Sequence, residues 1–176
     1  STLAEALADR TLVIGTTAGT HRLPRAEVVP LPELAAQARP GARAALVFGP
    51  EKHGLTNEDL SYCHLLARIP TAETCPSMNL GQAVAVCCYE WTRSGPTPTT
   101  AAPAEQASLG EIEELRSELE KVLRMAGYFP WGAHPSDSHK LRRLLLRLRL
   151  SSHDLATLRG MVAQLRWKIA ATAMNQ

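Results

Sequence analysis

The sequence lacks the features that mark a membrane protein, a secreted protein or a zinc protein. No apolar run in its 176 residues approaches the roughly 20 residues that a bilayer-spanning helix needs. The first residues contain no basic stretch followed by an apolar core, which disfavours a signal peptide. The histidines are scattered, with no H-x-x-x-H pair and no Cys/His cluster. We therefore expect a cytoplasmic protein with no membrane contact and no bound metal.

Several common enzyme motifs are missing as well. The sequence contains neither the dinucleotide motif G-x-G-x-x-G nor the P-loop motif G-x-x-x-x-G-K-[ST]. It also lacks the nucleophile elbow G-x-S-x-G of the α/β-hydrolases. The four cysteines form no C-x-x-C pair, and Cys87 and Cys88 are too close for an ordinary disulfide. We expect the cysteines to be small buried apolar side chains in a reducing compartment.

The composition that remains is that of an ordinary soluble globular protein, 45% hydrophobic and 20% charged. The length suits one medium domain, or a small domain with an appendage. The net charge is only +2. An RNA partner would therefore have to be recognised through a local cluster of positive charge rather than through the overall balance.

Short apolar runs alternate with helical patterns in the first half of the chain. Strands are predicted at residues 10–15, 44–48 and 65–70. Helices are predicted at residues 2–8 and 30–38, from Thr56 onward with Asp59 in a capping box, and at 79–91. The last helix is apolar on almost every side, which predicts burial. This alternation favours an α/β fold with a parallel sheet.

The composition changes after residue 93. Residues 94–108 contain three prolines and no large apolar side chain, which predicts a mobile linker. Beyond it, Ser108 and Glu111 form a capping box, Gly127 is a helix stop and Ser152 is a candidate cap. Apolar residues then recur in three helical stripes, namely Ile112, Leu115, Leu119 and Val122; Leu141, Leu144, Leu145 and Leu148; and Leu155, Leu158, Val162, Leu165 and Ile169. These stripes predict a small all-α domain.

Each predicted strand ends in small or turn-forming residues. The three strand ends are Gly15-Thr16-Thr17-Ala18, Gly49-Pro50-Glu51 and Ile69-Pro70-Thr71. Ligands of open parallel sheets bind at the carboxyl ends of the strands, and glycine lets a ligand approach the main chain closely. The pattern indicates a pocket for a flat polar small molecule that is recognised largely by main-chain groups. The alternative is that glycine and proline only end the strands.

Three motifs give the chain a family resemblance. They are F-G-x-E-x-x-G-L at residues 48–55, I-P at Ile69-Pro70, and Ser77-Met78-Asn79-Leu80, where the family has S-L-N-L. In this combination the sequence resembles the SpoU branch of the SPOUT methyltransferases, closest to its TrmJ group of tRNA and rRNA 2′-O-methyltransferases. The run L-V-I-G-T-T-A resembles another strand end of this group, and the C-terminal helices resemble its appended helical domain.

The resemblance implies an α/β parallel sheet with a C-terminal deep trefoil knot, plus a small C-terminal all-α domain. It divides the chain into a knotted S-adenosylmethionine-binding domain at 1–93 that lacks the family's N-terminal part, a linker at 94–108, and a helical domain at 109–176 for RNA binding. It also implies a homodimer with active sites near the subunit interface.

The resemblance assigns site residues by position. S-adenosylmethionine would be held by Thr16, Thr17, Ala18, Gly49, Ile69, Pro76, Ser77 and Met78. Glu51 would project into the active site as a catalytic residue, and Gly54 would allow a tight turn. Independently of the resemblance, Asn79 is predicted to act in the catalytic set as a hydrogen-bonding residue of the pocket, the alternative being a helix cap.

The family's catalytic step is assigned to an arginine in an N-x-G-x-x-x-R-like motif that this sequence does not contain. We therefore expect these 176 residues alone to be a poor catalyst. Arg22 or Arg25 is the candidate for facing the substrate in its place, the alternative being a solvated loop charge.

Positive charge is concentrated at residues 140–149. This run carries Lys140, Arg142, Arg143, Arg147 and Arg149 and no acid. If its leucines face the core, the cations face solvent, where they suit phosphate contacts. Lys140, Arg142, Arg143 and Arg147 are thus assigned to RNA binding, with Arg22 and Arg25. The alternative is that they pair with the acidic helix, which contains Glu111, Glu113, Glu114, Glu118 and Glu120.

The sequence therefore predicts S-adenosylmethionine-dependent 2′-O-methylation of ribose in RNA, with tRNA as the expected substrate. Two other classes stay open. One is a noncatalytic RNA-binding module that keeps the knot, and the other is an α/β enzyme that uses the same pocket for a nucleotide and acts on a small molecule.

Overall fold

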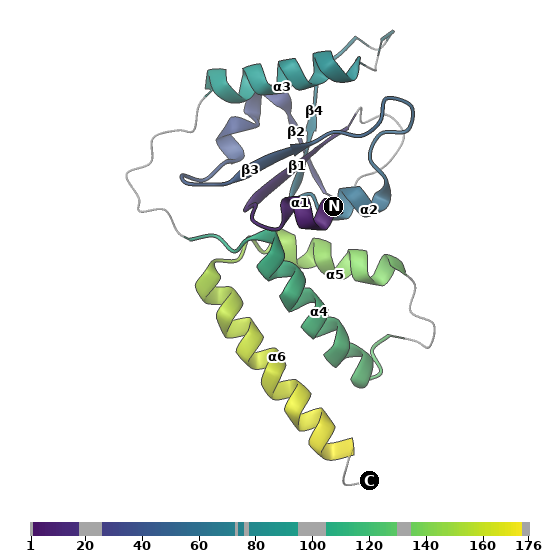
Figure 1. Ribbon diagram of the computed structural model, residues 1–176, viewed down its shortest axis with the longest axis vertical. Helices are drawn as coiled ribbons and strands as arrows, with labels where there is room; N and C mark the ends of the chain where they lie inside the picture. Colours follow the sequence, from purple (N-terminus) through teal and green to yellow (C-terminus); the bar gives the residue numbers. More distant parts are fainter. Residues whose placement is uncertain are drawn as a thin grey trace.

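A parallel four-stranded sheet forms the centre of the N-terminal half (Figure 1). The computed structural model describes residues 2–17, 26–72, 74–75, 78–94, 105–129 and 135–173. The strands are β1 (Leu12–Thr16), β2 (Glu27–Pro30), β3 (Ala44–Val47) and β4 (Leu65–Arg68), in the order β2-β4-β1-β3. All of the paired strands run parallel. The prediction of an α/β fold with a parallel sheet is confirmed.

The central strand β1 is apolar on both faces because both faces of the sheet are covered. Leu12 and Ile14 belong to one buried cluster, together with Leu65 of β4. Val13 points the other way and belongs to a second cluster, together with Leu66. Side chains along a strand alternate between faces, so a continuous apolar run is what two buried faces require.

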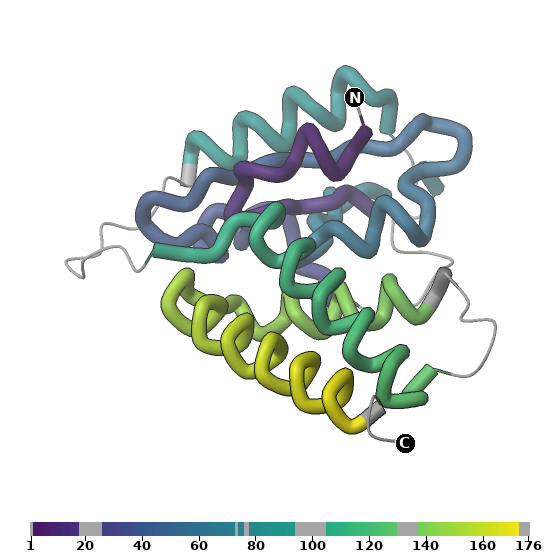
Figure 2. The backbone as a smooth tube through the Cα atoms, turned by 60° about the horizontal axis from the view of Figure 1, so that its bottom comes forward, coloured from purple at the N-terminus to yellow at the C-terminus, as the bar shows by residue number. Residues whose placement is uncertain are grey.

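One face of the sheet packs against α3 (Leu80–Ser94) and two 3₁₀ helices, η1 (Leu31–Glu33) and η2 (Ala35–Gln37). The other carries α1 (Leu3–Leu7), α2 (Asn57–Ser61) and the C-terminal helices α4 (Leu109–Met125), α5 (Pro135–Arg147) and α6 (Ser152–Ala173). Figure 2 shows the strands between α3 on one side and α4–α6 on the other. The far half of α6 extends away from the sheet (Figure 1).

The segment around residues 27–38 differs from its prediction. A helix was expected at residues 30–38, but the chain forms β2 up to Pro30 and then the short η1 and η2. β2 is an edge strand that pairs with β4, and only Val29 of its four residues is buried. A strand with so little burial produces no apolar run, which is why it was missed.

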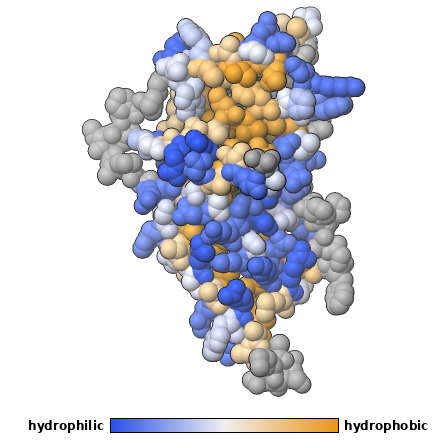
Figure 3. All heavy atoms as spheres, viewed as in Figure 1, coloured by the Kyte–Doolittle hydropathy of each residue, from blue (hydrophilic) through white to orange (hydrophobic). Residues whose placement is uncertain are grey.

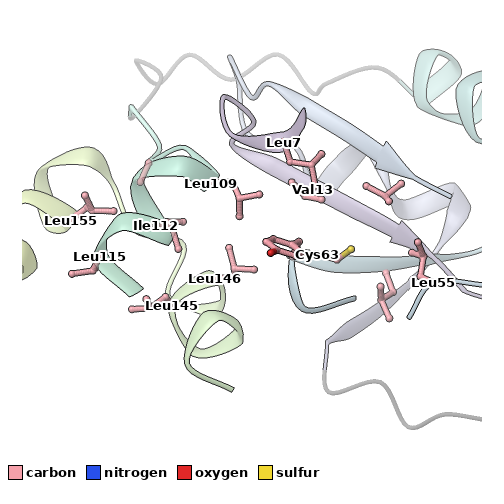
Figure 4. Packing of buried hydrophobic residues seen from close by; sticks show 14 of the residues in the cluster. Leu7, Val13, Leu55, Cys63, Leu109, Ile112, Leu115, Leu145, Leu146 and Leu155 are labelled. Atoms are coloured by element: carbon pink, nitrogen blue, oxygen red, sulfur yellow. The ribbon is translucent and has the colours of Figure 1, made fainter. Parts of the chain in front are cut away.

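The C-terminal helices share their core with the sheet. A single cluster of buried apolar residues runs from Val13 and Cys63 to Ile112, Leu146 and Leu155. In Figure 4, Leu109 and Leu146 reach from the helices toward Val13 and Cys63. α4 lies against both α5 and α6. The helices are therefore packed on the α/β part rather than only tethered to it.

The helix ends follow their predicted chemistry with one exception. Ser108 and Glu111 form the expected capping box, and so do Thr56 and Asp59. Gly127 ends α4 with a φ of 72°, a conformation that glycine adopts without strain. The cap of α6 is wrong by one residue, because the hydroxyl of Ser151 rather than Ser152 accepts from the Asp154 N–H.

The end of the expected linker is fixed in place. Ala107 is buried, and its N–H donates to the Leu150 carbonyl at 3.1 Å. The next helix is held as well, since the Leu109 N–H donates to the Arg10 carbonyl at 2.8 Å. The prediction of a mobile linker is therefore wrong for residues 105–108, and residues 95–104 lie outside the described part of the chain.

The prediction that α3 is a buried helix is also wrong in this single chain. Among its described side chains only Cys87 is fully buried, whereas Val84, Ala85, Cys88 and Tyr89 are exposed. Figure 3 shows hydrophobic side chains gathered over the upper part of the molecule, around α3 and the strands beneath it. Of the helices described, none has the length and hydropathy needed to cross a membrane.

The cysteines split evenly between inside and outside. Cys63 and Cys87 are buried as expected, whereas Cys75 and Cys88 are exposed, and none of the four is in a disulfide. Burial raises the pKa of Cys63 to about 12, and the charge of Asp59 adds to that effect. A thiol with such a pKa stays protonated and unreactive, so the role of Cys63 is packing.

His64 is expected to make the stability depend on pH. Burial and then the charge of Arg149 lower its pKa to about 4. The Val13 N–H donates to its Nδ1 at 3.0 Å, a contact that a proton on Nδ1 would displace. The unfolded state takes up this proton below about pH 6.5 while the fold does not, so about 3 kcal/mol of unfolding free energy should be lost between pH 6.5 and 4.

Urea unfolding of wild type and His64→Gln across this range measures the effect. The glutamine variant keeps an acceptor but does not titrate, so its pH dependence should be flatter. His53→Gln makes the same substitution at an exposed histidine and is the control for the change of side chain. Equal profiles for wild type and His64→Gln would contradict the prediction.

Candidate cofactor and RNA sites

The three predicted loops begin at neighbouring places on one edge of the sheet. Because β4, β1 and β3 are adjacent and parallel, their carboxyl ends meet at the same edge. The Thr16 hydroxyl donates to the Val47 carbonyl at 3.3 Å, and the Thr17 N–H donates to the Ala67 carbonyl at 3.0 Å. Thr16 and Thr17 therefore bind the ends of the three strands together.

The loop after β3 closes on itself. The Pro50 carbonyl accepts from the N–H groups of His53, at 3.3 Å, and Gly54, at 2.8 Å. Gly54 has a φ of 64°, which confirms the predicted tight turn. A Cβ on Gly49 would lie 2.2 Å from the Gly54 carbonyl carbon. Gly49 is thus needed first for contact with its own loop, whereas the sequence suggested contact with a ligand. Glu51 lies exposed in the turn between the two glycines.

Asn79 acts as a cap at the start of α3. Its side-chain oxygen accepts from the Gly81 N–H at 2.9 Å, and its carbonyl accepts from the Ala83 N–H at 2.9 Å. Of the two roles that the sequence left open, the cap is the one seen. Met78 precedes it and is half-buried.

The structure brings together part of the predicted cofactor set. Thr16, Thr17, Gly49 and Ile69 follow or end the three neighbouring strands, and Met78 leads into α3. The residues that lie outside the described part of the chain are Ala18, Pro76 and Ser77 of the cofactor set and Arg22 and Arg25 of the RNA set. In the described ranges, no group of three or more side chains is suited to hold a metal ion.

The predicted orientation of α5 is wrong at Arg142. Its side chain is only 6% exposed, and Nε and Nη2 donate to the two Glu113 carboxylate oxygens at 2.6 and 2.9 Å. The apolar register is shifted to match, because Leu146 is buried while Leu144 and Leu148 are exposed. α5 lies across α2 as well as α4, so the face that it buries is not the plain leucine stripe. Arg142 is therefore not available to contact phosphate.

The other cations of the run remain on or near the surface. Arg147 is exposed, and Lys140 is exposed while paired with Asp137 at 2.9 Å. Arg143 is half-buried, and its Nε donates to the His139 carbonyl at 3.2 Å. The alternative that this helix pairs with the acidic helix is thus confirmed for Arg142, while these three residues still form a basic surface. Below, "the basic face" means Lys140, Arg143 and Arg147.

The partners of Arg142 were not predicted. Its Nη1 donates to the Ser61 hydroxyl at 2.5 Å, and its guanidinium carbon lies 3.8 Å from the centre of the Tyr62 ring. Ser61 and Arg142 are 81 positions apart in the chain. The periodicity of a sequence reflects one helix at a time and does not show which distant helix a buried charge will contact.

Comparisons with known proteins agree with this fold. The family model for SpoU rRNA methylases matches residues 1–89. A tRNA (cytidine/uridine-2′-O-)-methyltransferase TrmJ of Yersinia pestis is 37% identical over 174 residues, which cover 93% of this chain and 67% of that protein. The protein of the same name from Cronobacter sakazakii is 36% identical and covers 93% of this chain and 71% of its own length.

A solved structure extends the likeness to three dimensions. The crystal structure of TrmJ from Z. mobilis ZM4 superimposes with a TM-score of 0.78 at 29% identity, covering 94% of this chain and 71% of that one. The fold, with its loops at one edge of a parallel sheet, is that of a methyltransferase. The chain belongs to the SpoU methylase family.

Proposed function

We propose that this protein transfers a methyl group from S-adenosylmethionine to the 2′-hydroxyl of a ribose in tRNA. The observation that carries the proposal is the match to tRNA 2′-O-methyltransferases over 93% of the chain, which includes the C-terminal helices. The family model is named for rRNA, but it covers only residues 1–89. The relatives that also share the helical part are named for tRNA, which favours tRNA as the substrate.

The carboxyl edge of the sheet suits a nucleoside held by main-chain groups. Three neighbouring strand ends offer peptide groups at one place, and the half-buried Ile69 adds an apolar contact of the kind that an adenine ring uses. The proposed contacts are Thr16, Thr17, Ala18, Gly49, Ile69, Pro76, Ser77 and Met78. When bound, S-adenosylmethionine supplies a methyl group on a positively charged sulfur, ready for attack by a nucleophile.

The protein's own task is to position the ribose and assist the loss of its proton. A 2′-hydroxyl is a weak nucleophile, so alignment and a nearby proton acceptor both raise the rate. Glu51 is the proposed acceptor, since its carboxylate stands exposed in the turn beside the edge. Asn79 contributes by fixing the start of α3. Arg22 and Arg25 are the proposed contacts to the substrate RNA near this edge.

The proposed function is tested in two experiments, because a protein can bind the cofactor without transferring its methyl group. The first is calorimetric titration with S-adenosylhomocysteine, which an enzyme that uses another nucleotide should ignore. The second is transfer of a labelled methyl group to bulk tRNA, followed by nuclease digestion to find a 2′-O-methylated nucleotide. Binding without transfer, both for this chain and for a version extended upstream, would favour the noncatalytic module.

The knot and the dimer belong to the same proposal. We propose that the segment from Ile69 to α3 forms the family's knot, and that the α/β part and the helical part divide at residues 94–108. The exposed apolar side chains of α3 support a second copy of the chain as the partner. Val84, Ala85 and Cys88 lie at helical spacing on one stripe of α3, with Tyr89 beside it. We propose that this dimer acts in the cytoplasm, where a tRNA substrate would be found.

Disrupting this stripe should separate the dimer. Val84→Asp puts a charge on a side chain that is 37% exposed in the single chain and would be buried against a second copy. Light scattering after gel filtration should give the mass of a dimer for wild type and of a monomer for Val84→Asp. Asn57→Asp adds the same charge at an exposed polar position of α2, on the other face of the sheet from α3, and should leave the mass unchanged. A wild-type monomer would refute the dimer.

The basic face is proposed to contact tRNA phosphates. Phosphate contacts release counterions, so affinity should fall steeply with salt. Changing Lys140 and Arg147 to Gln keeps helix propensity and removes two positive charges. The slope of log affinity against log salt should then shrink by about 0.7 to 0.9 for each phosphate that the variant no longer neutralises.

The matched control removes two exposed cations from the neighbouring helix. Lys121→Gln with Arg124→Gln makes the same charge change on α4, where Arg124 is paired with Glu120. In salt titrations of tRNA binding, the slope should shrink for Lys140→Gln/Arg147→Gln but not for Lys121→Gln/Arg124→Gln. Equal slopes in wild type and Lys140→Gln/Arg147→Gln would show that RNA binds elsewhere.

A further inference from the structure

Arg142 joins three helices that belong to different parts of the chain. From α5 it reaches Glu113 of α4 with two hydrogen bonds, and it reaches Ser61 at the end of α2 with a third. Its guanidinium also lies on the ring of Tyr62, which directly follows α2. Ser61 is fully buried, and its own hydroxyl donates to the Glu58 carbonyl at 2.6 Å. Each of the three nitrogen atoms of this guanidinium therefore donates to an internal partner.

The charges around Arg142 complete the network. Arg116 of α4 donates to Glu113 at 3.0 Å and to Glu120 at 2.6 Å, and its Nη1 also donates to the Ser138 hydroxyl of α5 at 2.6 Å. Glu113 is thus shared between two arginines. All described buried side-chain nitrogen and oxygen atoms have a hydrogen-bond partner. Such a fully satisfied network defines one arrangement of α2, α4 and α5.

α2 is the direct continuation of the loop that carries Glu51. Leu55 at the end of this loop is buried in the same cluster as Tyr62. Thr56 then caps α2, with its hydroxyl accepting from the Asp59 N–H at 3.1 Å. At the other end of the loop, Gly49 lies against the backbone of Gly54 and Leu55. A short and continuous set of contacts therefore runs from Arg142 to the edge where the cofactor is proposed to bind.

We propose that Arg142 is a positioning residue that holds the Gly49–Leu55 loop in place through α2. Arg142 fixes the position of the basic face on α5 relative to the cofactor edge. An RNA bound by α5 therefore meets a Gly49–Leu55 loop that is already formed. The cofactor and RNA parts of this inference rest on the proposed function. The coupling between α5 and the loop rests on the contacts alone.

An arginine suits this role better than an apolar side chain of similar volume. Replacing a buried ion pair by apolar residues is often neutral or even stabilising, so stability alone does not call for it. The planar guanidinium fixes direction, because its two edges must meet Glu113 and Ser61 while its face meets Tyr62. Lysine keeps the charge but lacks this geometry.

The test compares Arg142→Lys and Ser61→Ala with Arg159→Lys. Arg159 also ties two helices together, since it pairs with Glu114 at 2.9 Å and Glu118 at 3.4 Å, but it joins only α6 to α4. A general loosening of the helices should therefore appear in both arginine variants. Ser61→Ala removes only one hydrogen-bond partner of Arg142. It therefore still tests the proposal if Arg142→Lys does not fold.

The first readout is amide hydrogen exchange of the loop, which needs no ligand. We expect the Gly54 N–H, which is bonded to the Pro50 carbonyl, to exchange at least about 5-fold faster in Arg142→Lys and Ser61→Ala. In Arg159→Lys it should exchange at the wild-type rate. Unchanged loop exchange in the first two variants, or equal acceleration in all three, would overturn the proposal.

The second readout is binding of S-adenosylhomocysteine by calorimetry. Affinity should fall by at least about 5-fold in the two coupling variants, Arg142→Lys and Ser61→Ala. It should stay within about 2-fold of wild type in Arg159→Lys. If wild type binds no S-adenosylhomocysteine, the proposed function fails, while the exchange result still decides on the coupling. If wild type binds it and the coupling variants bind it equally well, the inference about the loop is wrong.

Discussion

Replacing Glu113 with alanine is expected to remove about 3–5 kcal/mol from the free energy of unfolding. The change leaves Arg142 buried without its carboxylate partner. Water cannot replace the lost attraction, because the side chain of Arg142 is only 6% exposed. Burial opposes ionisation of Glu113, but hydrogen bonds and charges from Arg142 and then Arg116 hold its pKa below the usual range. The pair therefore contributes stability above the carboxyl's ordinary pKa, and this contribution is lost as the pH falls through the lowered value.

The adjacent residue provides the control. Glu114→Ala makes the same change one position along α4, where the carboxylate is 62% exposed and pairs with Arg159 at 2.9 Å. Exposed pairs of this kind contribute about 0–1 kcal/mol. Urea unfolding of both variants at pH 7 measures the difference. Equal losses would show that Glu113 is no more than a surface partner, and the network through Arg142 would lose its energetic basis.

Gly49→Ala is expected to abolish binding of S-adenosylhomocysteine, with at least about a 100-fold loss of affinity. The added Cβ would lie 2.2 Å from the Gly54 carbonyl carbon and 2.3 Å from the Leu55 nitrogen. Both atoms are main chain, so the loop must open rather than adjust one side chain. Opening it moves Gly49 away from the strand ends where the cofactor is proposed to bind. A loss of about 100-fold corresponds to about 2.7 kcal/mol of binding free energy.

Gly160→Ala is the matched control because the same methyl group meets nothing within 4 Å. This glycine lies inside α6, where alanine should stabilise the helix by up to about 1 kcal/mol. Calorimetry gives the affinities, and circular dichroism with thermal unfolding shows whether each variant is folded. A folded Gly49→Ala variant that binds the ligand as tightly as wild type would refute the proposed cofactor edge.

The elements that the sequence predicted well are those whose signals are local. β1, β3 and β4 are apolar runs that end in turn residues, and the caps at Thr56 and Ser108 are encoded within four positions. Gly54 and Gly127 were identified for the same reason, since a positive φ requires a particular residue. Local chemistry of this kind fixes where an element begins and ends, whatever it later packs against.

The features that were missed depend on partners far away in the chain. Leu144 looked like a core residue and Arg142 like a surface residue, but α5 is turned so that the arginine meets α2. The same limit applies to Gly49, where the close neighbour is Gly54 of the same loop rather than a ligand. The exposed side of α3 could not be predicted either. The sequence of an apolar helix has the same pattern whether the helix packs within its own chain or against a second chain.

The shared core has a consequence for how the chain acquires its structure. The N–H groups of Leu109 and Gly110 donate to the carbonyls of Arg10 and Ala8 at 2.8 Å each, so the start of α4 lies against the segment between α1 and β1. About a hundred residues separate these partners along the chain, and closing so long a loop before contacts form slows folding. The half that contains the sheet is synthesised first. Its residues Val13 and Leu66 remain uncovered until α4 and α5 have been synthesised and pack against them. We expect this interval to be the chain's period of greatest exposure to aggregation and its point of dependence on chaperones.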